Sequence, residues 1–382
     1  MKIGIVGLPN KGKSTLFSCL TKINVPIADY PFTTIDPNQG IGYIIVDCAC
    51  KNFNVKCNPR TKCVNGKRYV PINLVDIAGI VKDAHLGKGL GNYFLDRIRD
   101  SDALLQVIDI SGGTDINGNK AYDFSADPEE EINIFKDEFI KWVEEILKKH
   151  QRRFMQKKEE LAKVLSGLNF SEYDCELMIK KLNLDIKKIS EEERELLRIA
   201  NYAYERIPKA FIANKMDLGK AKSNFEKLKE KYTIYPTILV AEHFARRLEE
   251  QKFLEITDEI KQINFNVDTE LQKKINIIID IFDNKKLAKL STIILTDFVI
   301  NKMNYIVVFP VEDEHKLSDS KGNILPDAIL LKKGSNAIDL ANAIHSELGK
   351  NLITAIDVKR KINISKTDEL KHLDVIKLVV GK

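Results

Sequence analysis

Residues 7–14 read Gly-Leu-Pro-Asn-Lys-Gly-Lys-Ser, and this stretch decides the fold class of the chain. It matches the pattern G-x-x-x-x-G-K-[ST] and directly follows a β-branched run at residues 3–7. A helical pattern with Leu16, Phe17 and Leu20 on one face begins after it. In such a turn, successive backbone N–H groups converge on phosphate oxygens at the positive end of a helix. The stretch therefore predicts a phosphate-binding loop.

Short apolar runs recur on both sides of helical and turn segments. They lie at residues 41–46, 70–75, 103–108 and 210–213. Apolar runs that alternate with helices are typical of a mainly parallel sheet covered by helices on both faces. We therefore predict an α/β fold of the P-loop type.

Changes of pattern along the chain indicate a domain organisation. A helical stretch begins at Asp127-Pro128, where an N-cap residue is followed by proline at the first helical position. After a second helical stretch, strands around one amphipathic helix at residues 335–348 indicate a small α+β domain. The predicted parts are a nucleotide-binding domain (1–126 and 207–245), a helical insertion (127–206), a second helical segment (246–303) and a C-terminal domain (304–382).

Composition limits the classes of partner. The chain has 382 residues, and its 60 Lys+Arg and 55 Asp+Glu give a net charge of only +5. This small excess excludes binding of nucleic acid through bulk charge. The sequence contains neither a run of 18 uncharged apolar residues nor a charged-then-apolar leader. We therefore expect a cytoplasmic protein with no membrane and no DNA partner.

Three segments predict how the phosphates and Mg²⁺ are held. Lys13 is expected to bridge the β- and γ-phosphates and Ser14 to ligate Mg²⁺. Asp76-Ile-Ala-Gly79 ends an apolar strand, so Asp76 can hold Mg²⁺ through water and the Gly79 N–H can bond the γ-phosphate. Thr34, with Thr33 as the alternative, is placed by chain order to reach both ion and γ-phosphate. The segments that carry Thr34 and Gly79 would lose their anchor when the γ-phosphate leaves. The sequence therefore predicts a nucleotide-dependent conformational switch.

Asn214-Lys215-Met-Asp217 follows another apolar strand and predicts recognition of guanine. The Asp217 carboxylate accepts hydrogen bonds from guanine N1–H and the exocyclic amine, whereas adenine would leave it unpaired. The backbone N–H of Leu239 is a candidate donor to the base oxygen. The predicted nucleotide contacts are Gly7, Leu8, Pro9, Asn10, Lys11, Gly12, Lys13, Ser14, Thr15, Asn214, Lys215, Asp217 and Leu239.

The residue after Gly79 predicts slow hydrolysis. In many GTPases a glutamine there orients the attacking water, and here the position is Ile80. Catalytic roles then fall to Lys13, Thr34 and Gly79. Asn10 could hold a monovalent cation such as K⁺ against the phosphates. His85, in a glycine-rich segment, is a further candidate, although a histidine in such a loop is more often an exposed bystander.

Several motifs together resemble the Obg-related translation-factor GTPases, in particular the YchF branch in its archaeal form. They are the phosphate loop, Tyr-Pro-Phe-Thr-Thr-Ile-Asp-Pro-Asn (30–38), Asp-Ile-Ala-Gly-Ile-Val (76–81) and Gly-Lys-Gly-Leu-Gly-Asn (87–92). The resemblance covers nearly the whole chain and implies a C-terminal β-grasp domain of the TGS type. It also implies ribosome or ribosomal-subunit binding, a TGS domain that contacts RNA, and hydrolysis that lacks a catalytic glutamine and is activated by potassium in some relatives.

The resemblance leaves two alternatives to a GTP-hydrolysing switch that cycles between GTP and GDP. Several YchF proteins have a guanine motif ending in glutamate and prefer ATP, so an ATPase in stress regulation is one alternative. Asp217 argues for GTP in this chain. The other is a nucleotide-bound RNA-binding scaffold with little hydrolysis, which Ile80 keeps open.

Two further features of the sequence stay open. Basic residues gather at positions 148–163, 332–333 and 359–361, and such runs are either solvated surface or RNA contacts. Cys48, Cys50, Cys57 and Cys63 fall within sixteen residues. They could hold zinc, form a disulfide or remain free thiols, and the single residue between Cys48 and Cys50 is shorter than the usual zinc spacing.

Overall fold

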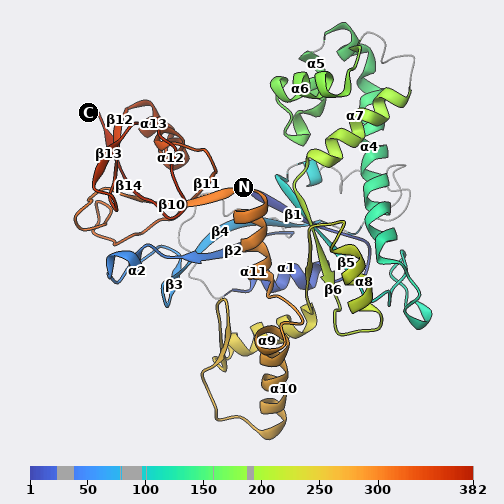
Figure 1. The fold of residues 1–382 in the computed structure, drawn as a ribbon, viewed down its shortest axis with the longest axis horizontal. Coiled ribbons are helices and arrows are strands. Elements are labelled where there is room, and N and C mark those ends of the chain that lie inside the picture. The colour runs from blue at the N-terminus through green and yellow to red at the C-terminus, as the bar shows by residue number, and fades with distance from the viewer. Residues whose placement is uncertain are drawn as a thin grey trace.

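The structure is a computed structural model, and it describes residues 1–23, 38–77, 79, 97–99, 101–157, 159–186 and 193–381. Two large sheets and one two-stranded sheet organise these residues, with helices packed on and between the large sheets (Figure 1). Among the described residues, no helix is long and apolar enough to cross a membrane.

A seven-stranded sheet forms the centre of the molecule, in the order β2-β4-β1-β5-β6-β7 with β3 beside β4. The pairings among β4, β1, β5, β6 and β7 are parallel, whereas β2 and β3 run antiparallel to β4. The predicted mainly parallel sheet is therefore confirmed, with an antiparallel edge. The strands are β1 (Lys2–Val6), β2 (Gln39–Asp47), β3 (Lys62–Val64), β4 (Lys67–Asp76), β5 (Ala103–Asp109), β6 (Lys209–Asn214) and β7 (Ile234–Pro236).

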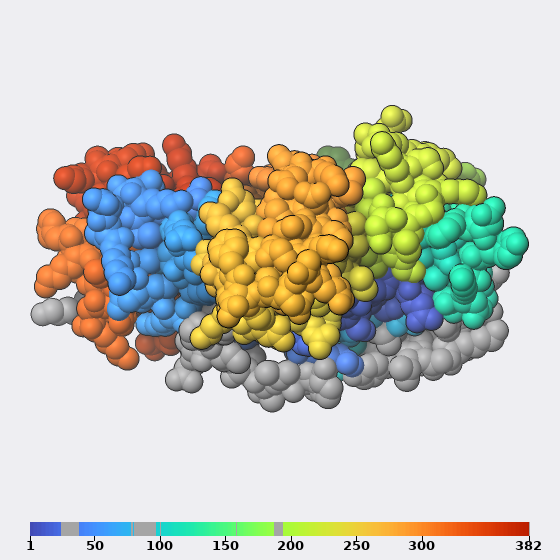
Figure 2. Space-filling model, turned by 90° about the horizontal axis from the view of Figure 1, so that it is seen from below, coloured from blue at the N-terminus to red at the C-terminus, as the bar shows by residue number. Residues whose placement is uncertain are grey.

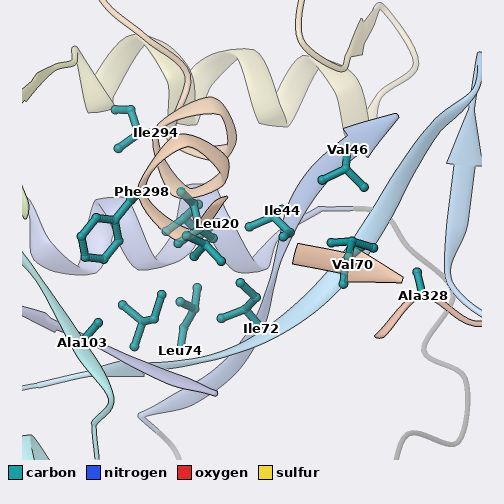
Figure 3. Close-up of a cluster of buried hydrophobic side chains, with 14 of the residues drawn as sticks. Leu20, Ile44, Val46, Val70, Ile72, Leu74, Ala103, Ile294, Phe298 and Ala328 are labelled. Carbon is teal, nitrogen blue, oxygen red and sulfur yellow. The ribbon is translucent and has the colours of Figure 1, made fainter. Parts of the chain in front are cut away.

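Both faces of this sheet are covered, which explains why its strands are continuous apolar runs. Every residue of β5 is buried. Helices α1 (Lys13–Thr21) and α11 (Ser291–Asp297) cover one face, where Leu20 and Ile294 pack near Ile44 and Leu74 (Figure 3). The helix α4 (Pro128–Gln156) covers the other face through Phe135 and Phe139. Residues at the carboxyl ends of the parallel strands are thus held in place by a hydrophobic core on each face of the sheet.

The first helix of the insertion begins where Asp127 and Pro128 predict it. Asp127 accepts a hydrogen bond from the Glu129 N–H, Pro128 occupies the first turn of α4, and three glutamates follow. Phe139 contacts both Trp142 and Tyr204, with ring centroids 5.6 Å apart in each pair, and joins α4 to α7. The remaining helices are α5 (Glu159–Leu165), α6 (Glu172–Leu182) and α7 (Glu193–Arg206), with a 3₁₀ turn at Ser166–Leu168.

The segment after β7 is helical, but it differs from the expectation in two places. Its first helix, α9 (Leu239–Glu250), starts before Arg246, and a hairpin of β8 (Leu254–Ile256) and β9 (Ile260–Gln262) follows. The alternation of buried Leu254, Ile256 and Ile260 with polar residues favours strands over helix. The other elements of this segment are α10 (Thr269–Ile279) and π-helical turns at Asp280–Asn284 and Phe298–Lys302, while α8 (Ala221–Leu228) lies before it, between β6 and β7.

The C-terminal residues form the second sheet, in the order β11-β10-β14-β12-β13. The helix predicted at residues 335–348 is split, because His345 is extended and its side chain accepts a hydrogen bond from the Glu347 N–H at the start of α13. The elements are β10 (Tyr305–Val311), β11 (Ile329–Lys332), α12 (Ala337–Ile344), α13 (Ser346–Lys350), β12 (Leu352–Asp357), β13 (Ile362–Ile364) and β14 (Val375–Val380).

The two sheets share a core. Val307, Val311 and Leu325 belong to the same buried cluster as Leu20 and Ile72 of the central sheet. The space-filling view also shows residues 38–77, in blue, lying against the orange and red C-terminal domain (Figure 2). The antiparallel edge of the central sheet therefore supports the C-terminal domain.

Candidate functional site

The loop between β1 and α1 has a backbone that glycine alone fits at two positions. Gly7 has φ 142° and Gly12 has φ 108°, both in the left-handed region. A Cβ on Gly7 would lie 2.4 Å from the Val107 carbonyl oxygen, and one on Gly12 would lie 2.4 Å from the Asn214 Nδ2. The loop is therefore packed tightly between β5 and the end of β6.

The Lys11 side chain anchors this loop to the protein interior. Its side chain is fully buried and its Nζ lies 2.8 Å from Glu131 Oε1 of α4. The same Nζ donates to the Thr114 carbonyl, the Thr114 hydroxyl and the Asp115 carbonyl. The Lys11 side chain is thus committed to the protein, so that any contact of Lys11 with a nucleotide must come from its backbone.

Lys13, Ser14, Asp76 and Gly79 converge at the open side of the loop. Lys13 Nζ donates to the Leu8 carbonyl at 2.8 Å, and a Cβ added to Gly79 would lie 3.0 Å from that Nζ. The Ser14 hydroxyl donates to Asp76 Oδ2 at 3.0 Å. Burial lowers the pKa of Lys13 and raises the pKa of Asp76. The first turn of α1 and the end of β4 therefore bring together an ammonium, a hydroxyl and a carboxylate.

This donor set fits Mg²⁺, because Mg²⁺ takes hydroxyl and carboxylate oxygens together with water. Ser14 would provide a direct ligand and Asp76 one through water. Thr15 lies half-buried in the first turn of α1, beside these residues. The expected roles of Thr34, Thr33, Ile80 and His85 fall outside the described residues.

Asn214 joins the phosphate loop to the start of α9. Its Nδ2 donates to the Lys11 carbonyl at 2.9 Å, and its Oδ1 accepts from the Leu239 N–H at 3.1 Å. The Asn214 side chain is only 6% exposed, so these bonds fix three segments of the chain to one another. They place the turn that carries Lys215 and Asp217 beside the loop.

Lys215 and Asp217 leave this turn in different directions. Lys215 Nζ lies 2.6 Å from Asp109 Oδ2. Burial would raise the pKa of Asp109, but hydrogen bonds from Lys215, Ser111 and Thr114 hold it below its usual value. Asp217 is exposed, and it has no hydrogen-bond partner within the described part of the chain. Its carboxylate is thus available to a ligand.

The structure corrects the role expected of Leu239. Its N–H is already bonded to Asn214, so it is not available to a base. The next donor is the Val240 N–H, which has no partner among the described residues and belongs to a residue that is 77% exposed. Sequence reasoning did not name the Val240 N–H as a candidate donor. The signal that could have found it is the start of α9 after Thr237, since the first N–H groups of a helix lack internal partners.

Asn10 projects from the phosphate loop in the left-handed conformation, with φ 60°. Its Nδ2 donates to the Gly118 carbonyl at 3.0 Å. The amide nitrogen is therefore occupied, and the Oδ1 remains as the acceptor that a monovalent cation would require. This arrangement is compatible with the K⁺ role expected of Asn10.

The basic clusters differ in whether their side chains already form ion pairs within the protein. In the 359–361 cluster, Arg360 Nε lies 2.6 Å from Asp357 Oδ2, whose residue is buried. On α4, exposed Lys149 and Arg152 form no ion pair in the described ranges. A cavity of about 580 Å³ opens between α4 and α5, and its charged lining includes Arg99, Lys149, His150, Arg153, Glu160 and Lys163.

Comparisons with known proteins agree with this geometry. Residues 2–156 match a family described as 50S ribosome-binding GTPase. Residues 212–313 match the G4 motif-containing domain of Obg-like GTPases of the YGR210 type, and residues 321–380 match the TGS domain.

Similar proteins match over almost the full chain. A GTP-binding protein of Methanocaldococcus jannaschii is 41% identical over 99% of this chain and 98% of its own length. A ribosome-binding ATPase YchF of Buchnera aphidicola is 29% identical over 94% and 88%. A crystal structure of a GTP-binding protein from Pyrococcus horikoshii covers both chains completely, with 29% identity and a TM-score of 0.78. The chain therefore belongs to the Obg-like, YchF-type GTP-binding proteins, with a P-loop GTPase domain and a C-terminal TGS domain.

Proposed function

We propose that the protein is a cytoplasmic GTP-hydrolysing switch that associates with the ribosome or RNA. The observation that carries the nucleotide part is the Asn214 bridge between the Lys11 carbonyl and the Leu239 N–H. It ties the phosphate loop to the segment that carries Asp217. A phosphate chain on the loop and a guanine on Asp217 would thus belong to one ligand.

Each residue of the loop has a role in this proposal. The Lys13 ammonium would leave the Leu8 carbonyl and bridge the β- and γ-phosphates, aided by the Gly79 N–H. Ser14 would hold Mg²⁺ directly, Asp76 would hold it through water, and Thr34 would add a further ligand. When bound, Mg²⁺ neutralises charge that develops on the phosphate oxygens.

Hydrolysis by the isolated protein is proposed to be slow. Ile80 follows Gly79 and has no group that could orient a water molecule. Asn10 Oδ1 would hold K⁺ against the phosphates, and the ion would supply positive charge there. A ribosomal partner is then the source of useful turnover, which fits a switch whose signal is read on the ribosome.

Asp217→Asn tests the assignment of the base. In competition binding with Mg²⁺ and K⁺ present, the native protein should prefer GTP over ATP by about two orders of magnitude, because adenine leaves the carboxylate unpaired. The variant should lose this preference and should gain affinity for xanthosine triphosphate. Xanthine carries a carbonyl where guanine has its amine, and that carbonyl accepts a hydrogen bond from the asparagine amide.

The gain for xanthine shows that the variant is folded, so no loss of structure can imitate the result. Glu226→Ala, an exposed acid on α8, serves as the matched control and should leave all affinities unchanged. Comparable affinities of the native protein for GTP and ATP would instead support an ATPase, as some relatives are named.

The ribosome or RNA part rests on the family description and on the basic surface of α4. Replacing Lys149 and Arg152 by alanine should weaken ribosome binding and flatten its salt dependence, by about one unit of slope for each phosphate group that the variant no longer neutralises. The measurement is the dissociation constant at several salt concentrations.

Lys180→Ala/Lys181→Ala on α6 is the charge-matched control, since both lysines lie on the outer surface of that helix. The TGS cluster is tested in the same way by neutralising Lys359, Arg360 and Lys361. An unchanged slope in the α4 variant would remove that surface from the proposal. A slope changed only in the TGS variant would move the binding surface there.

A further inference from the structure

Four cysteines separated in the sequence meet at the edge of the central sheet. Cys48 follows β2, Cys50 begins the short helix α2 (Cys50–Phe53), Cys57 lies in the irregular segment after it, and Cys63 lies in β3. Their Sγ atoms all lie within 4.8 Å of one another. Cys48 and Cys57 are 3.9 Å apart, and Cys50 and Cys63 are 4.0 Å apart.

This spacing is that of a tetrahedral metal site. Four sulfur ligands, each about 2.3 Å from a zinc ion, lie about 3.8 Å from one another. A disulfide would need a sulfur–sulfur separation of about 2.05 Å, and all four cysteines are free. The helical turn at Ala49 allows Cys48 and Cys50 to face the same point, which overcomes the short spacing between them in the sequence.

Arg68 gives an independent indication that the cluster carries negative charge. Its side chain is fully buried, and its Nη2 donates to the Cys48 Sγ at 3.3 Å and to the Leu325 carbonyl at 2.8 Å. Its Nε and Nη1 have no hydrogen-bond partner within the described residues. The guanidinium also lies over the Phe309 ring, 5.3 Å from its centroid.

A buried cation needs a compensating anion, because leaving water is costly for an unpaired charge. No carboxylate forms an ion pair with Arg68 in the part of the chain that the structure describes. Asp327 interacts with the Arg68 charge without forming an ion pair, so neutral thiols or disulfides would leave the guanidinium with no anionic hydrogen-bond partner. A zinc ion with four thiolates has a net negative charge and accepts N–H···S hydrogen bonds, so it satisfies the guanidinium.

We propose that Cys48, Cys50, Cys57 and Cys63 hold one zinc ion in a closed, structural tetrathiolate site. Zinc fits because soft thiolate ligands in a tetrahedral arrangement select it, and because four protein ligands leave no open position for catalysis. The site is independent of the nucleotide proposal.

The structure also indicates what the ion stabilises. The irregular segment between Cys50 and Cys63 docks on the TGS domain, where the Asn58 N–H donates to the Ile324 carbonyl and the Arg60 N–H donates to the Pro326 carbonyl, both at 3.1 Å. Figure 1 shows α2 and β3 on the same side of the central sheet as that domain. Zinc would hold this segment in shape and thereby fix the TGS domain against the GTPase domain.

Metal analysis of the full chain tests the site. Protein produced with zinc in the medium should contain one zinc ion per chain. Replacement by cobalt should give thiolate-to-metal charge transfer and the intense d–d bands of a tetrahedral site. Cys57→Ser and Cys63→Ser should weaken zinc binding at least about a hundredfold, since loss of an outer-shell partner alone costs ten- to hundredfold.

Cys175→Ser, a buried cysteine of α6, is the matched control and should retain the zinc. Hydrogen exchange on the native chain adds a readout that needs no variant. Removing zinc with a chelator should expose the amides of Asn58 and Arg60, which are bonded to the TGS domain. Zinc-free protein from zinc-supplemented cells that gives no cobalt spectrum would overturn the proposal. Intact disulfides by mass spectrometry, or iron in place of zinc, would overturn it equally.

Discussion

Replacing Glu242 by glutamine is expected to lower the free energy of unfolding by about 3 kcal/mol, the lower end of the cost of removing one partner from a buried ion pair, because Glu249 still lies beside Arg246. Glu242 of α9 is fully buried and accepts hydrogen bonds from the Ser291 N–H at 2.8 Å and the Ser291 hydroxyl at 2.6 Å. Arg246 is 1% exposed, and its Nη2 lies 3.3 Å from Glu242 Oε1. Its Nη1 also lies 3.0 Å from Glu249 Oε2, which remains as a carboxylate partner in the variant, whereas its Nε has no hydrogen-bond partner among the described residues.

Urea denaturation measures this loss of stability. Two further variants serve as a control and as a test of its cause. Glu250→Gln changes an exposed glutamate at the end of the same helix and should shift the free energy of unfolding by less than about 0.5 kcal/mol. Glu242→Leu combined with Arg246→Met removes both charges and should recover most of the stability. If this double variant is no more stable than Glu242→Gln, the loss comes from packing and not from the removal of one of the two carboxylates that pair with Arg246.

The parts of the site that could be predicted are those in which local sequence and chain order decide the geometry. The phosphate loop requires left-handed glycines at fixed positions, and Gly7 and Gly12 have that conformation. Asn214 is the last residue of a buried parallel strand, so its place at the carboxyl end of that strand follows from the apolar pattern. Both signals are local, and tertiary contacts did not override them.

The parts that could not be predicted depend on which distant group a side chain reaches. Leu239 was expected to face the base, but Asn214, which lies 25 residues earlier, takes its N–H. The cysteine spacing argued against a metal, and only the turn at Ala49 brings Cys48 and Cys50 together. No pattern in the sequence indicates that Arg68 is buried against the TGS domain, because that burial requires two domains to pack.

Replacing Lys13 by alanine is expected to weaken GTP binding by about 2 to 5 kcal/mol, or roughly thirtyfold to several thousandfold, as is usual when one partner of a close charge pair is removed. Lys13 Nζ lies beside Gly79 and close to Ser14 and Asp76, at the place assigned to the terminal phosphates. Burial lowers the pKa of Lys13, so bringing phosphate charge to this ammonium stabilises its charged form. The measurement is equilibrium binding of a fluorescent GTP analogue.

The dependence on phosphate number separates this role from general damage to the loop. Lys13 is assigned to the β- and γ-phosphates, so the variant should lose far more affinity for GTP than for GMP. Lys22→Ala, at the exposed end of the same helix, should leave both affinities unchanged. Equal losses for GTP and GMP would mean that alanine disturbs the backbone of the loop, because a collapsed loop weakens every nucleotide alike. The electrostatic role of Lys13 would then be withdrawn, while the base assignment to Asp217 would stand on its own test.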